Sequence, residues 1–168
     1  FTYRSKIWKG RYGKNNTNFK NMNVTIRPLV EEDAYTSVKW RNDPEVFKFT
    51  GNTYKTKITI DNELEWIRKV IANTNDYRCA ILVDEVYVGN IYLTDIQEGK
   101  AHYHIFIGNK NYWGKGVAKK ASLLILDYAV KVLKLKEIFL RVRKENTSAY
   151  NLYLRLGFKN VMVDGDWT

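Results

Sequence analysis

The chain has 168 residues, enough for one domain, and its 45% hydrophobic and 14% aromatic content exclude a disordered protein. No apolar run approaches about 18 residues, and the N-terminus lacks the apolar core of a signal peptide, so we expect no membrane span. One cysteine excludes an internal disulfide, and two histidines with that cysteine do not make an ordinary structural zinc site. We therefore expect a soluble, cytoplasmic protein with no metal cofactor and no membrane partner.

The net charge of +10 is concentrated at the N-terminus, because residues 1–21 hold six basic residues and no acidic one. Met22 looks like the start of a domain, so we place a basic extension or tag at 1–21 and a single domain at 22–168. A processed product and a nucleic-acid-binding arm are alternatives for the extension. The rest of the chain lacks the aromatic and basic strand pattern of an RNA-binding surface, so we expect no nucleic-acid partner.

Apolar periodicity, caps and turn residues predict the elements in chain order. A strand at 24–27 is followed by helices at about 31–41 and 45–47 and by one that begins at Thr59 or Asp61. Strands at 77–83, 86–95 and 100–108 then form a meander with turns at 84–85 and 97–99. The last elements are a helix over 118–132, a strand at 137–143, a helix at 147–156 ended by Gly157, and a strand from 158.

This order predicts an α+β fold built on one mixed sheet flanked by helices. The meander strands pair antiparallel, and the helix that precedes 137–143 brings that strand in parallel at the centre of the sheet. Cys79 falls within a strand, so we interpret it as a small buried side chain rather than a nucleophile.

The most informative segment is Asn111-Tyr112-Trp113-Gly114-Lys115-Gly116-Val117-Ala118, which lies between a strand-like and a helix-like run. A glycine-containing turn that enters a helix points unpaired N–H groups at one place, where the helix dipole adds positive charge. Lys115 and Lys119 add more positive charge, so a phosphate fits the turn. A tight connection without a ligand has the same pattern, and the spacing matches neither a Walker loop nor a dinucleotide-binding fingerprint.

Two spaced motifs in this order resemble the GCN5-related N-acetyltransferase (GNAT) superfamily. Residues 111–116 fit its Gln/Arg-x-x-Gly-x-Gly/Ala signature except at Asn111, and their Tyr-Trp-Gly-Lys-Gly form is similar to the branch of ribosomal-protein and spermidine N-acetyltransferases. Residues 40–46 also resemble that branch. The resemblance runs from about residue 24 to the C-terminus. A second family signature is kept, with every spacing, by Asn146, Ala149, Tyr153, Gly157 and Phe158.

The resemblance implies that acetyl-CoA is the cosubstrate and that its pyrophosphate binds at the glycine-containing turn. Its pantetheine arm would lie where the parallel strands 100–108 and 137–143 splay apart. Backbone groups near Phe106 and Ile107 would pair with the arm, and a free N–H there would polarise the thioester carbonyl. The implied cofactor-binding residues are Phe106, Ile107, Asn111, Tyr112, Trp113, Gly114, Lys115, Gly116, Val117, Ala118 and Asn146.

Two residues are candidates for the catalytic proton transfers. The resemblance implies that Tyr153 gives a proton to the departing CoA thiolate, and a phenol with a pKa of about 10 suits a thiolate of comparable basicity. The alternative is that Tyr153 only packs on its helix. His104 shares a strand face with His102 and titrates in a useful range, so it is the candidate base. Water, a carboxylate and a purely structural role for His104 are the alternatives.

The acceptor pocket is expected around the first helices and residues 49–54, with Trp40, Arg41 and Asn42 as substrate-binding residues. The leading hypothesis is direct acetyl transfer, in a ternary complex, to a primary amine of a small molecule or a nucleotide-linked amino sugar. The alternative acceptor is a ribosomal-protein N-terminus or a polyamine, although a polycation favours more acidic residues than the sequence shows. A non-catalytic acyl-CoA-binding module is the competing class.

We expect a monomer or a homodimer. The chain stops near the point where the family's final strand begins or continues, so we expect that strand to be incomplete. Residues 1–21 are a candidate to fill its place.

Overall fold

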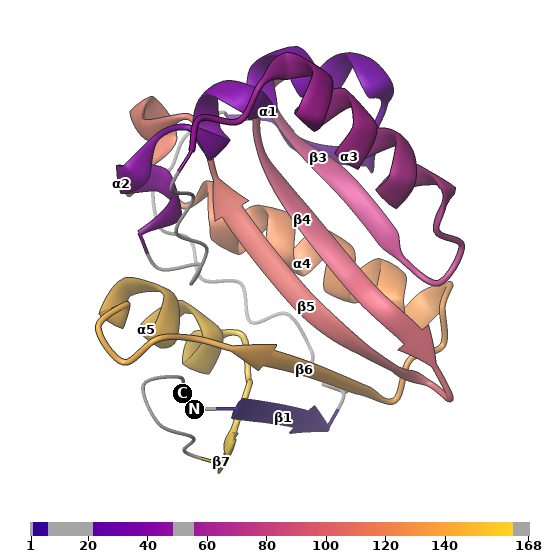
Figure 1. Ribbon diagram of the computed structural model, residues 1–168. Coiled ribbons are helices and arrows are strands. Elements are labelled where there is room, and N and C mark those ends of the chain that lie inside the picture. Colours follow the sequence, from indigo (N-terminus) through magenta and orange to yellow (C-terminus); the bar gives the residue numbers. More distant parts are fainter. Residues whose placement is uncertain (1, 7–21, 49–55, 163–168) are drawn as a thin grey trace.

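The computed structural model describes residues 2–6, 22–48 and 56–162, and it confirms the predicted α+β fold (Figure 1). The strands are β1 (Thr2–Lys6), β2 (Val24–Pro28), β3 (Tyr77–Val83), β4 (Val86–Gln97), β5 (Lys100–Ile107), β6 (Glu137–Arg141) and β7 (Asn160–Met162). The helices are α1 (Ala34–Arg41), α2 (Pro44–Phe47), α3 (Ile60–Ala72), α4 (Val117–Lys131) and α5 (Thr147–Arg155), with 3-10 turns η1 (Glu31–Asp33) and η2 (Lys110–Tyr112).

The strands form one sheet in the order β2-β3-β4-β5-β6-β1-β7. Pairing is antiparallel from β2 to β5 and parallel between β5 and β6, as the meander and the crossover helix predict. Both meander turns adopt positive φ, at 84–85 and at 98–99, which is the backbone conformation that two-residue hairpin turns require. The predicted antiparallel meander and parallel centre are therefore confirmed.

Strand β1 is an element that the sequence patterns did not predict. Its residues, which we had assigned to a basic extension, pair antiparallel with β6 in a register that runs from Thr2–Arg141 to Lys6–Glu137. Its other edge pairs antiparallel with β7. Part of the N-terminal segment thus lies between two C-terminal strands. Residues 7–21 and 49–55 and the end of the chain lie outside the described residues.

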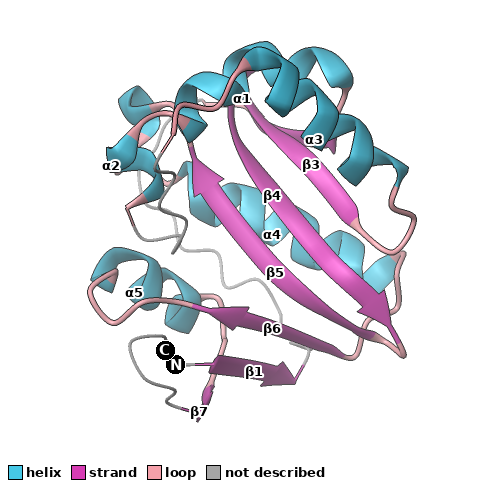
Figure 2. Cartoon of the chain, viewed as in Figure 1, coloured by secondary structure: helices cyan, strands magenta, loops and turns pink. Residues whose placement is uncertain are grey.

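Helices cover both faces of the sheet: α1 and α3 lie on one face and α4 on the other (Figure 2). Cys79 and Ile81 of β3 pack in the cluster that contains α4, whereas Ala80 and Leu82 pack in the cluster that contains Ile67 of α3. A strand buried on both faces has a continuous apolar run, which explains the sequence pattern there. Burial raises the pKa of the Cys79 thiol to about 11, so the prediction of an inert, buried cysteine is confirmed. In the described part of the chain, no helix has the length and apolarity to cross a membrane.

Candidate active site

A cavity of about 1770 Å³ reaches from the first helices, on one face of the sheet, to the start of α4, on the other face. Side chains of α1, α2 and α3 line one end, which we call the acceptor end. The turn before α4, strand β6 and helix α5 line the other end, which we call the cofactor end. A pocket for one drug-sized ligand holds roughly 300–1,000 Å³, so this cavity has room for two ligands at once.

The parallel pair β5–β6 opens at the cofactor end. Its pairing covers only Lys100–Glu137, Ala101–Ile138 and His102–Phe139, and the strands then diverge (Figure 2). The Gly108 N–H bonds to the Val88 carbonyl of the neighbouring meander strand at 2.8 Å. Because strand groups alternate in direction, the N–H and C=O groups of Ile105 and Ile107 face the gap instead. Beyond the paired stretch, these two residues therefore offer backbone groups to an extended ligand.

Helix α4 begins beside this gap without a side-chain cap. Gly116 is its N-cap residue, with φ +79°, a left-handed conformation that favours glycine. The first bond of the helix runs from the Lys120 N–H to the Gly116 carbonyl, so the N–H groups of residues 117–119 have no intrahelical partner. By contrast, Asp43, Thr59 and Asn146 cap their helices with side-chain oxygens. An uncapped helix N-terminus that lines a cavity, beside Lys119, suits an anion.

Tyr153 of α5 lies at the cofactor end and lines the cavity. Its side chain is 93% buried, since its relative exposure is 7%, and its ring meets Tyr103 edge-on with centroids 5.8 Å apart. The Phe158 ring also meets the Tyr153 ring edge-on, with centroids 6.0 Å apart. This burial raises the pKa of the Tyr153 phenol well above its usual range, so the hydroxyl stays protonated at any physiological pH. Both of its possible roles, packing and proton donation, are compatible with this position.

His104 lines the floor of the cavity, and its Nε2 lies 3.0 Å from Thr94 Oγ1. The side chain is exposed, but the surrounding protein still removes part of its hydration. This loss of hydration, with help from Arg78 and His102, lowers the pKa of His104 to about 4. The imidazole is therefore neutral at pH 7, and it holds a proton only weakly.

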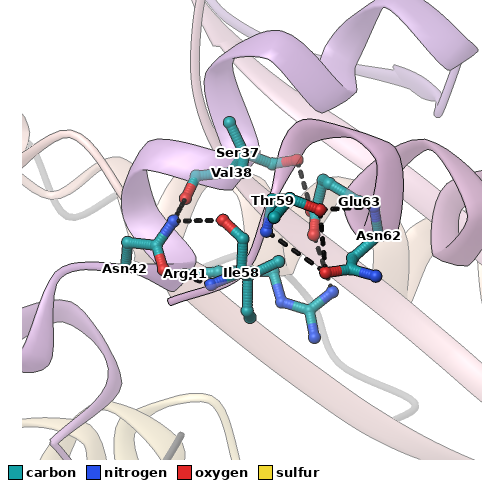
Figure 3. A network of polar contacts seen from close by, with 8 residues as sticks. All are labelled: Ser37, Val38, Arg41, Asn42, Ile58, Thr59, Asn62 and Glu63. Atoms are coloured by element: carbon teal, nitrogen blue, oxygen red, sulfur yellow. Dashed lines mark hydrogen bonds and ion pairs between the residues drawn. The ribbon is translucent and has the colours of Figure 1, made fainter. Parts of the chain in front are cut away.

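A polar network joins α1 to α3 at the acceptor end (Figure 3). Glu63 has no exposed surface and accepts from Ser37 Oγ at 2.7 Å and from Arg41 Nη1 at 2.8 Å. Asn42 donates to the carbonyls of Val38 and Ile58 and accepts from the Ile58 N–H. Arg41 lines the cavity, whereas Asn42 holds the segment that enters α3 and does not line it.

Several acceptor-end residues were not predicted from the sequence. Arg78 bonds to Asp76 through Nε at 3.0 Å, and its guanidinium lies 4.6 Å from the centroid of the Tyr92 ring. Trp66 lies within 5.8 Å of Arg78 and within 4.8 Å of Arg41. The contacts of Trp66 with both arginines and of Arg78 with Tyr92 join different elements, so no local sequence pattern predicts them. Asp95 is exposed at the register shift of β4, with φ +52°, and also lines the cavity.

The structure brings most of the predicted residues to this cavity, but not all. Trp40 is buried against Gly108 and does not line it. Asn111 and Lys115 also lie outside its lining, and Lys115 lies over the Tyr112 ring at 5.8 Å. Residues 49–54 are outside the described residues. Among the described residues, no group of three or more His, Cys, Asp or Glu side chains is placed to hold a metal ion. Predicted cofactor-site residues that do line the cavity are Phe106, Ile107, Tyr112, Trp113, Gly114, Gly116, Val117, Ala118 and Asn146.

The mixed sheet with its opened parallel pair, beside an uncapped helix, is the arrangement expected of an N-acetyltransferase from the resemblance to the GNAT superfamily. Comparison with known families agrees: a model described as acetyltransferase (GNAT) domain matches residues 23–159. The chain therefore belongs to the GNAT acetyltransferase family, and the resemblance drawn from its motifs is confirmed.

Relatives that match most of the chain include a spermidine acetyltransferase and an uncharacterised N-acetyltransferase. The chain is 30% identical over 146 residues to the spermidine N(1)-acetyltransferase of Escherichia coli K12, covering 85% of this chain and 75% of that protein. It is 29% identical over 141 residues to the uncharacterised N-acetyltransferase p20 of Bacillus licheniformis, covering 81% of this chain and 79% of that one.

Solved structures with the same fold include two with high overlap. A domain from Methanocaldococcus jannaschii superimposes with a TM-score of 0.75 at 22% identity, covering 88% of this chain and 96% of that one. Spermidine N-acetyltransferase from Vibrio cholerae, in complex with CoA and spermine, gives a TM-score of 0.74 at 24% identity, covering 85% and 89%. A dodecameric form of the V. cholerae enzyme gives 0.68 at 25% identity, covering 83% and 81%.

Proposed function

We propose that the protein transfers the acetyl group of acetyl-CoA to a primary amine of a polyamine. The observation that carries this proposal is the uncapped N-terminus of α4 beside the gap between β5 and β6. The N–H groups of residues 117–119 and the charge of Lys119 fit a pyrophosphate. The gap-facing backbone of Ile105 and Ile107 fits the amides of a pantetheine arm, as an added strand does. The chain's residues therefore fit acetyl-CoA.

Different residues stabilise the carbonyl oxygen and protonate the departing sulfur. Acetyl-CoA supplies a thioester carbonyl that a neutral amine attacks directly when both are bound. A gap-facing N–H, from Ile105 or Ile107, stabilises negative charge that develops on the carbonyl oxygen. Tyr153 keeps its proton because burial raises its pKa, and it donates that proton to the departing sulfur.

The attacking ammonium must first lose a proton. A pKa of about 4 makes the His104 imidazole too weak a base to hold that proton at neutral pH. We assign His104, held by Thr94, the role of orienting solvent in the cavity, and water accepts the proton.

The carboxylates at the acceptor end support a polyamine. Glu63, Asp76 and Glu45 are ion-paired with Arg41, Arg78 and Lys110 respectively. Asp95 lines the same cavity and has no ion-pair partner among the described residues. It is therefore available to bind a second ammonium of the acceptor while the first reacts. The spermidine acetyltransferases among the relatives support the same choice of acceptor.

A nucleotide-linked amino sugar, which led the hypotheses drawn from the sequence, becomes the second candidate. Arg41 and Arg78 are the cations that would hold its anionic groups. Both are committed to buried or nearly buried carboxylates, at 2.8 Å and 3.0 Å. The acceptor end therefore offers less positive charge than the sequence suggested, and the relatives argue for a polyamine.

The same relatives also support a proposal for the oligomeric state. The V. cholerae spermidine acetyltransferase has a dodecameric form, which supports an assembly larger than the monomer or homodimer that we expected. Analytical ultracentrifugation of the purified protein measures this mass directly. A species of one or two chains across the micromolar range contradicts the larger assembly.

An amine panel tests the proposed reaction. The protein is incubated with acetyl-CoA and, separately, with spermidine, spermine, a ribosomal-protein N-terminal peptide, and a nucleotide-linked amino sugar. CoA release is followed with a thiol reagent, and the acetylated product is identified by mass spectrometry. We expect release and acetylation with spermidine or spermine. Acetylation of the amino sugar alone overturns the acceptor, and CoA binding without turnover on any amine overturns the enzyme.

A further inference from the structure

At the cofactor end, the side chain of Trp113 makes a hydrogen bond to the end of β5. Its indole Nε1–H donates to the Ile107 carbonyl at 2.7 Å. The side chain is 40% exposed and lines the cavity, so it is not part of the packed core. Its own backbone N–H donates to the carbonyl of Lys110, the first residue of η2. The contact therefore joins the turn before α4 to the last residue of β5, six positions earlier in the chain.

The acceptor of this bond lies on the gap-facing edge of β5. Gly108 and Asn109 both direct their N–H groups to Val88, away from the gap. By alternation the Ile107 carbonyl faces the gap, and the position of the indole agrees. Trp113 thus binds the same strand edge that we assign to the pantetheine arm.

Two binding surfaces meet at this contact. Trp113 begins the turn whose N–H groups, from 117 onward, face the pyrophosphate, and Ile107 ends the strand edge. A ligand that bridges two subsites binds best when their separation is fixed in advance, because less freedom is lost on binding. The indole bond supplies such a fixed separation without burying the side chain.

We propose that Trp113 is a positioning residue for acetyl-CoA, on the assumption that the proposed function is correct. Its indole bond holds the pyrophosphate turn at a set distance from the gap-facing edge of β5. Since the indole occupies the Ile107 carbonyl, Ile105 is the gap-facing residue that pairs with the pantetheine through both its N–H and its C=O.

Two substitutions isolate the bond from the bulk of the ring. Trp113→Phe removes the N–H donor. Trp113→His also shortens the side chain, but it keeps a five-membered ring whose Nε2–H occupies the place of the indole Nε1–H. Trp66→Phe is the matched control, because Trp66 lines the acceptor end of the same cavity. Calorimetry at pH 8 measures the Kd of CoA, of adenosine 3′,5′-diphosphate and of pantetheine for each variant.

Trp113→Phe is expected to weaken CoA binding by about three- to tenfold, the equivalent of one net hydrogen bond. Each half-ligand should bind within about twofold of its affinity for the original protein, because each occupies only one subsite. Trp113→His should recover most of the CoA affinity, and Trp66→Phe should leave it unchanged.

Three results overturn the proposal. The first is equal CoA affinity in the original protein and Trp113→Phe. The second is an equal loss of affinity for CoA and for either adenosine 3′,5′-diphosphate or pantetheine, which would mean that the indole belongs to the subsite of that smaller ligand. The third is no recovery in Trp113→His. The variants could show the expected CoA affinities while the protein acetylates no amine. That result would support the positioning role of Trp113 and overturn only the proposed reaction. A protein that binds no CoA overturns both.

Discussion

The indole of Trp40 lies directly on Gly108, so closely that a Cβ atom at Gly108 would approach Trp40 Cδ2 to 2.0 Å. Trp40 belongs to α1, and Gly108 follows the last residue of β5. The same ring meets Tyr87 at 4.7 Å and Phe106 at 6.1 Å, edge-on in both cases. This contact fixes α1 on the end of β5, and Arg41 is the next residue of that helix. The acceptor end of the cavity therefore depends on a glycine outside its lining.

Gly108→Ala should destabilise the protein by about 2 kcal/mol, the typical cost of forcing extra volume into a packed site. The indole is a rigid ring rather than the flexible end of a side chain, so relief requires α1 to move. Urea denaturation measures the free energy of unfolding. Gly114→Ala is the control: a Cβ there meets nothing within 4 Å, and only its φ of +70° opposes the change. Equal losses in both variants would contradict the packing argument.

The fold was predictable where the signals are local. Turn residues at 84–85 and 97–99 predicted the meander, and the crossover helix predicted the parallel centre. Strand β1 was not predictable, because its partners lie more than a hundred residues away in β6 and β7. Short strands owe their pairing to such partners rather than to their own propensity.

The candidate site divides in the same way. The turn at 111–118 and the spacing of Tyr153 are local patterns that placed the cofactor end. Trp40, Arg41 and Asn42 were chosen together from the region of the first helices, but successive helical residues face different sides of the helix, and only Arg41 lines the cavity. Ile105 also lines the cavity but was not predicted, although the two-residue alternation of a strand groups it with Ile107.

Glu63→Gln should destabilise the protein by about 3 kcal/mol, because it leaves Arg41 largely buried without its carboxylate. The loss of stability arises from the ion pair that joins α1 to α3 and does not involve the catalytic groups. Ser37→Ala, which removes one hydrogen bond to the same carboxylate, should cost only about 1 kcal/mol. Chemical denaturation compares the two variants. A Glu63→Gln protein as stable as the original would show that the ion pair is energetically neutral here.

Tyr153→Phe should lower kcat by more than about tenfold and leave the Kd of acetyl-CoA within about twofold. The ring and its contacts with Tyr103 and Phe158 survive, so the loss reports the phenolic proton. Steady-state kinetics and calorimetry measure the two quantities. Tyr150→Phe is the matched control, since it removes a hydroxyl from the same helix at a position outside the cavity lining. Unchanged turnover in Tyr153→Phe would assign Tyr153 to packing alone.

His104→Gln should leave the acidic limb of the pH–rate profile between pH 6 and pH 9 in place. With its pKa lowered to about 4, His104 is already neutral across that range and contributes no titration there. The unfolded chain takes up this proton first, so the stability owed to the neutral ring falls as pH drops from about 6.5 toward 4. Profiles of kcat/KM for the amine test the kinetic claim. Disappearance of the limb in His104→Gln would instead make His104 the general base.

Asp95→Asn should raise the KM for spermidine by about fivefold, the effect of one partly solvated ion pair of about 1 kcal/mol. The strand bulge and the left-handed φ of Asp95 tolerate asparagine as well as aspartate, so the backbone should persist. Glu98→Gln removes an equal charge from the same hairpin outside the cavity and should leave KM unchanged.

A monoamine such as propylamine separates binding of the second ammonium from a general effect of charge. It has no distal ammonium for Asp95, so its KM should be the same in the original protein and in Asp95→Asn. Asp95 lies on the β4–β5 hairpin, away from the turn at α4, so the KM for acetyl-CoA should also stay constant. An equal rise in KM for spermidine and for propylamine would mean that Asp95 acts on the reacting amine or on the cavity as a whole. In that case the unpaired carboxylate no longer argues for a polyamine, and the choice of acceptor rests on the relatives alone.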